Sequence, residues 1–247
     1  MDEVLHMLDH CLEEKRGDYI CVANVHTTVM AFRDEKYRKI QNESWMTIPD
    51  GKPLSLVSRK RGFTDAQRVP GPDLMVKVFE ASKEKGYCHF FYGSTDQTLR
   101  MLRENIEKKY PYVNVVGMYS PPFRPLTAEE DQQIIKMINE IHPDFVWVGL
   151  GAPKQEIWMA EHKNKIQAIM IGVGAAFDFE AGMIKRAPKW MQEMCLEWLH
   201  RILQDPKRLI PRYVSTNATF LWNVYKEGKQ IHRDQIKIAM IGHKRIP

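Results

Sequence analysis

Cysteine is scarce in this chain, and its spacing excludes two common ways of stabilising a small fold. Cys11, Cys21, Cys88 and Cys195 lie far apart with no paired spacing. The sequence therefore suggests neither a zinc cluster nor a disulfide framework. Thiols that stay unpaired fit a reducing, cytosolic compartment.

Long hydrophobic runs are absent as well. The apolar segments 145–150 and 168–177 fall well short of the roughly 18 to 20 residues that a membrane-spanning helix needs. Residues 1–15 carry acidic residues among the apolar ones and lack the three regions of a signal peptide. We therefore expect neither a membrane span nor a signal peptide. With 247 residues and 44% hydrophobic content, the chain predicts one domain with a terminal appendage.

Excess positive charge is missing from most of the chain. The net charge is +5, but residues 198–247 hold ten basic and three acidic residues, whereas residues 1–197 hold twenty-six and twenty-eight. This asymmetry indicates an anionic partner for the last segment. The charge alone does not decide whether that partner is phospholipid headgroups, a pyrophosphate or nucleic acid.

Strand-like and helix-like segments alternate through the first two hundred residues, which is typical of an α/β fold. The pattern predicts one helical face that includes Phe32 and Tyr37, a helix capped by Asp73, and a capping box at Thr127. We expect a Rossmann-like α/β domain over residues 1–195 and a basic, helical, membrane-associating C-terminal appendage over residues 196–247, broken at prolines 206 and 211. Strands of a largely parallel sheet are expected at residues 19–25, 45–48, 88–92, 112–117, 144–150 and 168–173.

Polar residues follow several of these strands, where open α/β sheets bind their ligands. Gln155 and Glu156 follow a glycine-containing loop that lacks the full dinucleotide and P-loop fingerprints, so the pattern allows either a phosphate-binding loop or a tight turn. Asp178 and Glu180 could form half of a metal site, but no further ligand lies nearby, and we favour a sugar-hydroxyl or ribose contact for Asp178. Asp50 follows a short strand, where a Pro-Asp-Gly sequence is also an ordinary turn.

Histidines offer no clear metal site in the sequence. His6 and His10 are four residues apart, as two ligands on one helix face would be, but no third ligand is evident. We interpret them, together with His142 and His162, as surface residues, and His26 as a residue at the edge of the core.

Six segments of the chain together resemble the WecG/TagA/CpsF glycosyltransferases, with matching order and spacing from about Tyr19 to Arg212. The segments are IPDG (48–51), QRVPGPDL (67–74), FFYG (90–93), YSPPF (119–123), VGLGAPKQE (148–156) and GVGAAFD (172–178). The resemblance implies an inverting glycosyltransferase that needs no metal or other cofactor. It implies transfer of a sugar from a UDP-sugar to a polyprenyl-diphosphate-linked saccharide, in the synthesis of bacterial capsule, exopolysaccharide or wall polymer. The protein would act at the inner face of the plasma membrane, as a peripheral protein on an anionic surface.

The resemblance also assigns roles to individual residues. Asp50 matches the base that deprotonates the acceptor hydroxyl, and Arg68 matches a position near the diphosphate. The other matching positions are Tyr119, Gly151, Gln155, Glu156 and Asp178 for the nucleotide sugar, and Asn24 and Thr27 for the acceptor. The resemblance further implies that arginines of the appendage complete the site at the membrane and the diphosphate, and the candidates for them are Arg201, Arg208 and Arg212.

Two rival functions remain open at the level of sequence. The chain could be a UDP-sugar-modifying enzyme, which would need a redox cofactor or a second acid or base. It could also be a non-catalytic module on the same fold that binds membrane or nucleic acid, although no nucleic-acid motif accompanies the basic segment. The sequence also leaves a homo-oligomer open.

Overall fold

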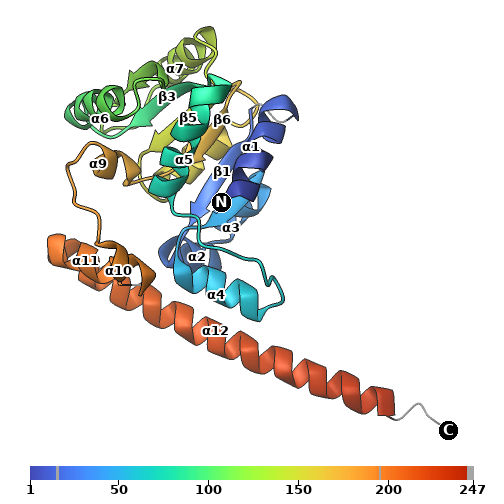
Figure 1. The fold of residues 1–247 in the computed structure, drawn as a ribbon. Helices are drawn as coiled ribbons and strands as arrows, with labels where there is room; N and C mark the ends of the chain where they lie inside the picture. The colour runs from blue at the N-terminus through green and yellow to red at the C-terminus, as the bar shows by residue number, and fades with distance from the viewer. Residues whose placement is uncertain (15–16, 195, 244–247) are drawn as a thin grey trace.

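A six-stranded sheet, parallel throughout, forms the centre of the computed structural model, which describes residues 1–14, 17–194 and 196–243 and, within them, all side chains except those of residues 14, 208 and 230–243. The strand order is β2-β1-β6-β5-β3-β4 (Figure 1). The strands are β1 (Tyr19–Ala23), β2 (Met46–Pro49), β3 (Cys88–Gly93), β4 (Asn114–Tyr119), β5 (Phe145–Gly149) and β6 (Ile169–Gly172). The expectation of an α/β fold is confirmed, and the sheet has no antiparallel pair among the described strands.

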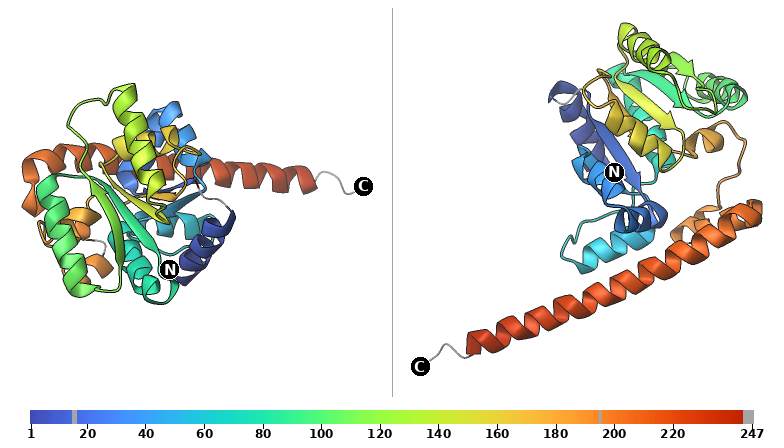
Figure 2. Two further views of the ribbon diagram at one scale, coloured as in Figure 1. Left: turned by 90° about the horizontal axis from the view of Figure 1, so that it is seen from above. Right: turned by 180° about the vertical axis from the view of Figure 1, so that it is seen from behind.

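Helices cover both faces of the sheet, because parallel strands need crossover connections. One core layer joins the sheet to α1, α5, α6 and α9, and the other joins it to α7 and α8 (Figure 2). The helices are α1 (Asp2–Glu14), α2 (Val25–Arg33), α3 (Glu35–Glu43), α4 (Lys52–Lys60), α5 (Gly71–Lys85), α6 (Asp96–Lys109), α7 (Ala128–Glu140), α8 (Lys154–Glu161), α9 (Ala176–Glu180), α10 (Lys189–Glu193), α11 (Glu197–Gln204) and α12 (Pro206–His243).

The middle of the core contains a small polar network. The Trp147 indole N–H donates to His89 Nδ1 at 3.1 Å, and the Ser82 hydroxyl lies 2.8 Å from His89 Nε2. Burial lowers the pKa of His89 to about 3, so the ring stays neutral. Its hydrogen bonds satisfy a polar group that would otherwise destabilise the core.

The last three helices lie beyond the carboxyl ends of β1 and β2. The long α12 packs against α2 and then projects past the α/β body (Figures 1 and 2). Arg33 on α2 donates to the Thr219 hydroxyl at 2.7 Å, and Arg61 at the end of α4 forms an ion pair with Glu227. Within the described residues, no helix has both the length and the apolar character needed to cross a bilayer. The division of the chain at residue 196 remains an interpretation of the sequence.

Several local expectations are wrong for identifiable physical reasons. The single helix expected through Phe32 and Tyr37 is two helices, because Asp34 adopts an extended backbone and its carboxylate caps α3. Phe32 is consequently exposed. Asp73 does not cap α5, which already begins at Gly71, and instead pairs with Arg186.

Two further expectations failed because tertiary packing overrides local preference. Helix α12 continues through Pro211, while Leu209, Thr216 and Phe220 on either side of it are buried against the rest of the molecule. His162 is buried rather than exposed, and its Nε2 lies 3.0 Å from the Asp131 carboxylate.

Candidate active site

A large cavity of about 1780 Å³ opens at the carboxyl ends of the strands. Its walls come from the segments that follow each of the six strands, and one further side comes from α11 and α12. Ligands of open parallel sheets bind at this edge. The volume exceeds the 300–1,000 Å³ that is usual for one small-molecule site, by roughly a factor of two. The cavity therefore has room for two substrates.

Asp50 is held rigidly in the wall of this cavity. It directly follows β2, and its backbone N–H donates to the Ala23 carbonyl at 2.8 Å. The side chain is only partly exposed. Burial raises the pKa of its carboxyl to about 6 against the opposing effect of the Arg68 guanidinium; Glu197 adds to the rise, while Arg201 and Arg186 oppose it. A carboxyl with this pKa can accept a proton near neutral pH.

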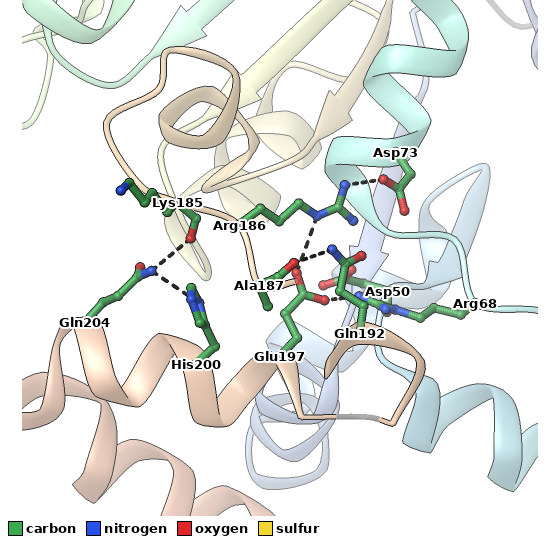
Figure 3. Close-up of polar contacts among 10 residues, drawn as sticks. All are labelled: Asp50, Arg68, Asp73, Lys185, Arg186, Ala187, Gln192, Glu197, His200 and Gln204. Atoms are coloured by element: carbon green, nitrogen blue, oxygen red, sulfur yellow. Dashed lines mark hydrogen bonds and ion pairs between the residues drawn. The ribbon is translucent and has the colours of Figure 1, made fainter. Parts of the chain in front are cut away.

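Arg68 lies beside Asp50 and is fixed in two directions. Its Nε donates to the Asp50 main-chain carbonyl at 2.7 Å, and its Nη2 pairs with the Glu197 carboxylate (Figure 3). The backbone on either side is tied to β2, because the Val69 N–H donates to the Pro49 carbonyl. The predicted base and the predicted diphosphate ligand, eighteen residues apart, are therefore neighbours.

Gln155 and Glu156, at the start of α8, are both almost fully buried. The Gln155 amide donates to the Glu156 carboxylate at 2.8 Å, and burial raises the pKa of Glu156. The Gln155 Oε1 atom has no hydrogen-bond partner among the described residues, yet Gln155 lines the cavity. Gly172 permits this approach, since a Cβ there would lie 3.0 Å from the Gln155 amide nitrogen. Gln155 can accept a hydrogen bond from a ligand. Glu156 lies behind the cavity wall and orients the Gln155 amide.

Asn24 and Thr27 also line the cavity, but they hydrogen-bond to one another as a capping box of α2. The Asn24 side chain accepts from the His26 and Thr27 N–H groups, at 3.0 and 3.2 Å. Thr27 Oγ1 accepts from the Asn24 N–H at 2.9 Å. These contacts position the loop after β1, and an acceptor-binding role for the two side chains stays a prediction.

The remaining predicted nucleotide-sugar residues divide into two groups. Gly151 and Asp178 line the cavity, and Asp178 belongs to the short helix α9. Tyr119 lies outside the lining and stacks on the cavity residue Tyr92, with ring centroids 6.0 Å apart. A contact between Tyr119 and uracil stays a prediction. In the part of the chain that the structure describes, no group of three or more His, Cys, Asp or Glu side chains could hold a metal ion.

Two of the three predicted appendage arginines reach the cavity. Arg201 of α11 lines it and lies 5.8 Å from the Phe179 ring centroid, and Arg212 of α12 also lines it. The Arg208 side chain lies outside the described residues, although its backbone belongs to α12. The appendage thus supplies positive charge to the same cavity as Asp50.

The sequence analysis assigned no role in the site to three residues that lie in or near the cavity. Arg186 and Glu197 join the group around Arg68 (Figure 3). His26 lines the cavity, and burial together with the nearby Arg212 and Arg33 lowers its pKa to about 4. The basic pair at residues 185 and 186, just before the change in composition at Pro188, was the available signal for Arg186.

Comparison with known proteins gives a family match and several similar proteins. The family described as "Glycosyl transferase WecG/TagA/CpsF family" matches residues 1–234. A protein of Bacillus spizizenii is 28% identical over 218 residues, covering 86% of this chain and 83% of its own length. A protein of Bacillus subtilis is 29% identical over 213 residues, covering 84% and 81%. One of Staphylococcus aureus (strain MW2) is 27% identical over 216 residues, covering 87% and 82%.

All three relatives bear the name N-acetylglucosaminyldiphosphoundecaprenol N-acetyl-beta-D-mannosaminyltransferase. The match to the family spans nearly the whole chain and includes every segment that forms the cavity. This protein belongs to the WecG/TagA/CpsF family of glycosyl transferases.

Proposed function

We propose that the protein transfers a sugar from a UDP-sugar to a polyprenyl-diphosphate-linked saccharide, with inversion at the anomeric carbon and without a metal ion. The sugar is of the hexose, N-acetylhexosamine or uronic acid type. The names of the relatives support the acceptor class, since they describe transfer to a sugar on diphosphoundecaprenol. The product would serve capsule, exopolysaccharide or wall polymer synthesis in a bacterium.

The observation that carries this proposal is the partly buried Asp50 carboxyl beside Arg68 in the cavity wall. As the acceptor hydroxyl attacks the anomeric carbon, Asp50 takes its proton. The bond between the anomeric carbon and the β-phosphate oxygen breaks, and UDP leaves with the electron pair. An inverting displacement needs only one base, because UDP leaves from the opposite face.

The arginines offset the charge that develops on the leaving diphosphate. Arg68 lies beside Asp50, and Arg201 and Arg212 reach the cavity from the appendage. Gln155 and Asp178 would bind hydroxyl or nucleotide groups of the donor, and Asn24 and Thr27 would face the acceptor. In this arrangement the appendage completes the site.

The appendage also carries the proposed membrane contact. Large apolar side chains are exposed along α11 and α12 in a segment with excess positive charge. Apolar side chains beside basic ones suit an anionic bilayer surface. This would place the protein on the cytoplasmic face of the plasma membrane, next to a lipid-linked acceptor. The exposed side chains are Trp198, Leu199, Leu203, Ile210, Val214, Leu221, Trp222 and Tyr225.

The test is transfer by the wild-type protein and an Asp50→Asn variant, using a panel of UDP-sugars and a lipid-linked acceptor, with products read by mass. We expect transfer to fall by roughly 10²- to 10⁴-fold in Asp50→Asn. The matched control is Asp65→Asn, which removes an exposed carboxylate outside the cavity and should leave the rate unchanged.

Other outcomes decide between the rival functions. Full activity of Asp50→Asn would remove Asp50 from the role of base. Consumption of the donor without acceptor would indicate a UDP-sugar-modifying enzyme instead. Loss of activity in a metal chelator would contradict metal independence, and retention of the donor's anomeric configuration in the product would contradict inversion.

A further inference from the structure

An acidic residue of the appendage lies where an anionic substrate is expected. The Glu197 carboxylate lines the cavity and pairs with Arg68 Nη2 through one oxygen (Figure 3). Its other oxygen lies 3.6 Å from Arg186 Nε. One carboxylate is therefore held between two guanidiniums that come from different parts of the chain.

Arg186 has hydrogen-bonding capacity that its present contacts do not use. Its Nη1 pairs with Asp73 on α5, which fixes the direction of the side chain. Its Nε and Nη2 atoms are buried, and neither has a hydrogen-bond partner in the described part of the chain. Buried guanidinium N–H groups without acceptors are costly, and an oxyanion with more acceptor atoms than a carboxylate could satisfy them.

The local charge balance points in the same direction. Arg68 and Arg186 pair with the same carboxylate, that of Glu197, and Arg201 lines the same cavity as Arg68 and Glu197. Among the described residues, the carboxylates that pair with Arg68 and Arg186 are those of Glu197 and Asp73, and Glu197 is shared by both arginines. A diphosphate brings more negative charge than the single carboxylate and matches guanidinium geometry.

From these contacts we infer that Arg68 and Arg186 form an anion subsite for a substrate diphosphate, and that Glu197 occupies it while no substrate is bound. A diphosphate entering the cavity displaces the Glu197 carboxylate and takes its place between the two guanidiniums. Arg186 is then a diphosphate-binding residue, and Glu197 is an internal competitor carried by the appendage. The inference rests on the proposed function for the nature of its ligand but not for its test.

Pairing with Glu197 stabilises the arginines of the subsite before a substrate binds. Without Glu197, Arg68 would lose its paired carboxylate and Arg186 would keep its pair with Asp73 alone among the described residues. Like charges that lie close together without such pairing destabilise the folded protein. Glu197 stabilises the empty site and ties α11 to the α/β body, and substrate binding exchanges one anion for another.

The experiment measures binding of inorganic pyrophosphate by isothermal titration calorimetry at constant ionic strength. Glu197→Gln removes the competing charge while keeping the shape of the side chain, so we expect affinity to rise about tenfold, which corresponds to about 1.4 kcal/mol. Arg186→Gln removes a ligand and should weaken binding about tenfold. Arg186→Lys keeps the charge but loses the planar guanidinium, so its affinity for pyrophosphate should lie between those of Arg186→Gln and the wild type.

A matched ion pair provides the control. Arg61 and Glu227 also join the α/β body to the appendage, but neither lines the cavity. Arg61→Gln and Glu227→Gln remove the same charges from the same two parts of the molecule and should leave pyrophosphate affinity within about twofold. A similar change in both pairs would mean that appendage docking, not the subsite, controls affinity, and would overturn the inference.

The remaining outcomes separate this inference from the proposed function. Unchanged or weaker binding in Glu197→Gln would show that Glu197 does not compete with the anion. Unchanged binding in Arg186→Gln would remove Arg186 from the subsite, and circular dichroism on each variant checks the fold. If the variants change pyrophosphate affinity as expected but the wild-type protein transfers no sugar, the proposed function is refuted and the subsite stands. If the wild-type protein transfers sugar but the variants bind pyrophosphate as the wild type does, only the subsite is refuted.

Discussion

Replacing Asp50 by asparagine should stabilise the protein at neutral pH while removing its proposed base. The folded carboxyl has a pKa of about 6, against an ordinary value of 3.8. The difference is about 2.2 pH units, and each unit corresponds to about 1.4 kcal/mol. Ionised Asp50 therefore costs the folded state up to ~3 kcal/mol. Because solvent still reaches the side chain through the cavity, screening reduces the expected value to about 1–2 kcal/mol.

The sign of the pH dependence follows from proton binding. Between the two pKa values the folded protein holds a proton on Asp50 that the unfolded chain has lost, so stability falls as pH rises through this window. The stabilisation is fully present below about pH 4 and is lost by about pH 6 to 7. Asparagine does not titrate, so the difference between Asp50→Asn and the wild type should grow from pH 4 to 6 and then stay constant.

Urea unfolding of both proteins at a series of pH values measures this difference directly. Asp65→Asn serves as the control, because its carboxylate is exposed and its replacement should leave the free energy of unfolding within about 0.5 kcal/mol at every pH. A variant Asp50→Asn that is less stable than the wild type above pH 6, or a difference that does not depend on pH, would refute the reasoning.

Three other predictions concern the core and the appendage. Gly93→Ala should destabilise the protein by about 2–4 kcal/mol in urea unfolding, because its φ is +120° and a Cβ would lie 2.7 Å from the β5 backbone; Gly228→Ala, in open space on α12, should not. Burial lowers the pKa of His89 to about 3, so as pH falls the unfolded chain binds a proton at this residue before the folded protein does. The free energy of unfolding of the wild type should therefore decline below about pH 6.5 relative to that of His89→Gln, by up to about 1.4 kcal/mol per pH unit. A parallel pH dependence of the two proteins would contradict this. Replacing the exposed Leu221 and Trp222 by serine should weaken sedimentation with anionic vesicles about tenfold or more, with circular dichroism unchanged; undiminished binding would argue against a membrane contact through this face.

The periodic parts of the fold were predictable because their signals are local. The buried strands β5 and β6 are nearly continuous apolar runs, as parallel strands covered on both faces require. The capping box at Thr127 formed as its spacing indicates. Proline and aspartate were less reliable signals of where a helix begins or ends, because each residue type can serve more than one structural role. Asp34 and Asp73 both lie near helix starts, yet Asp34 caps α3 and Asp73 binds a distant arginine.

By itself, the amino-acid sequence determined the α/β class, the family and the position of Asp50 after the second strand, because these depend on periodicity and on motifs of adjacent residues. Only the tertiary structure decided what surrounds Asp50. The Arg68–Glu197 pair joins residues 129 positions apart, and Arg186 reaches the same group from the loop after α9. Electrostatic partners are set by distance in space, and spacing along the chain carries no record of which charges the folded backbone brings together.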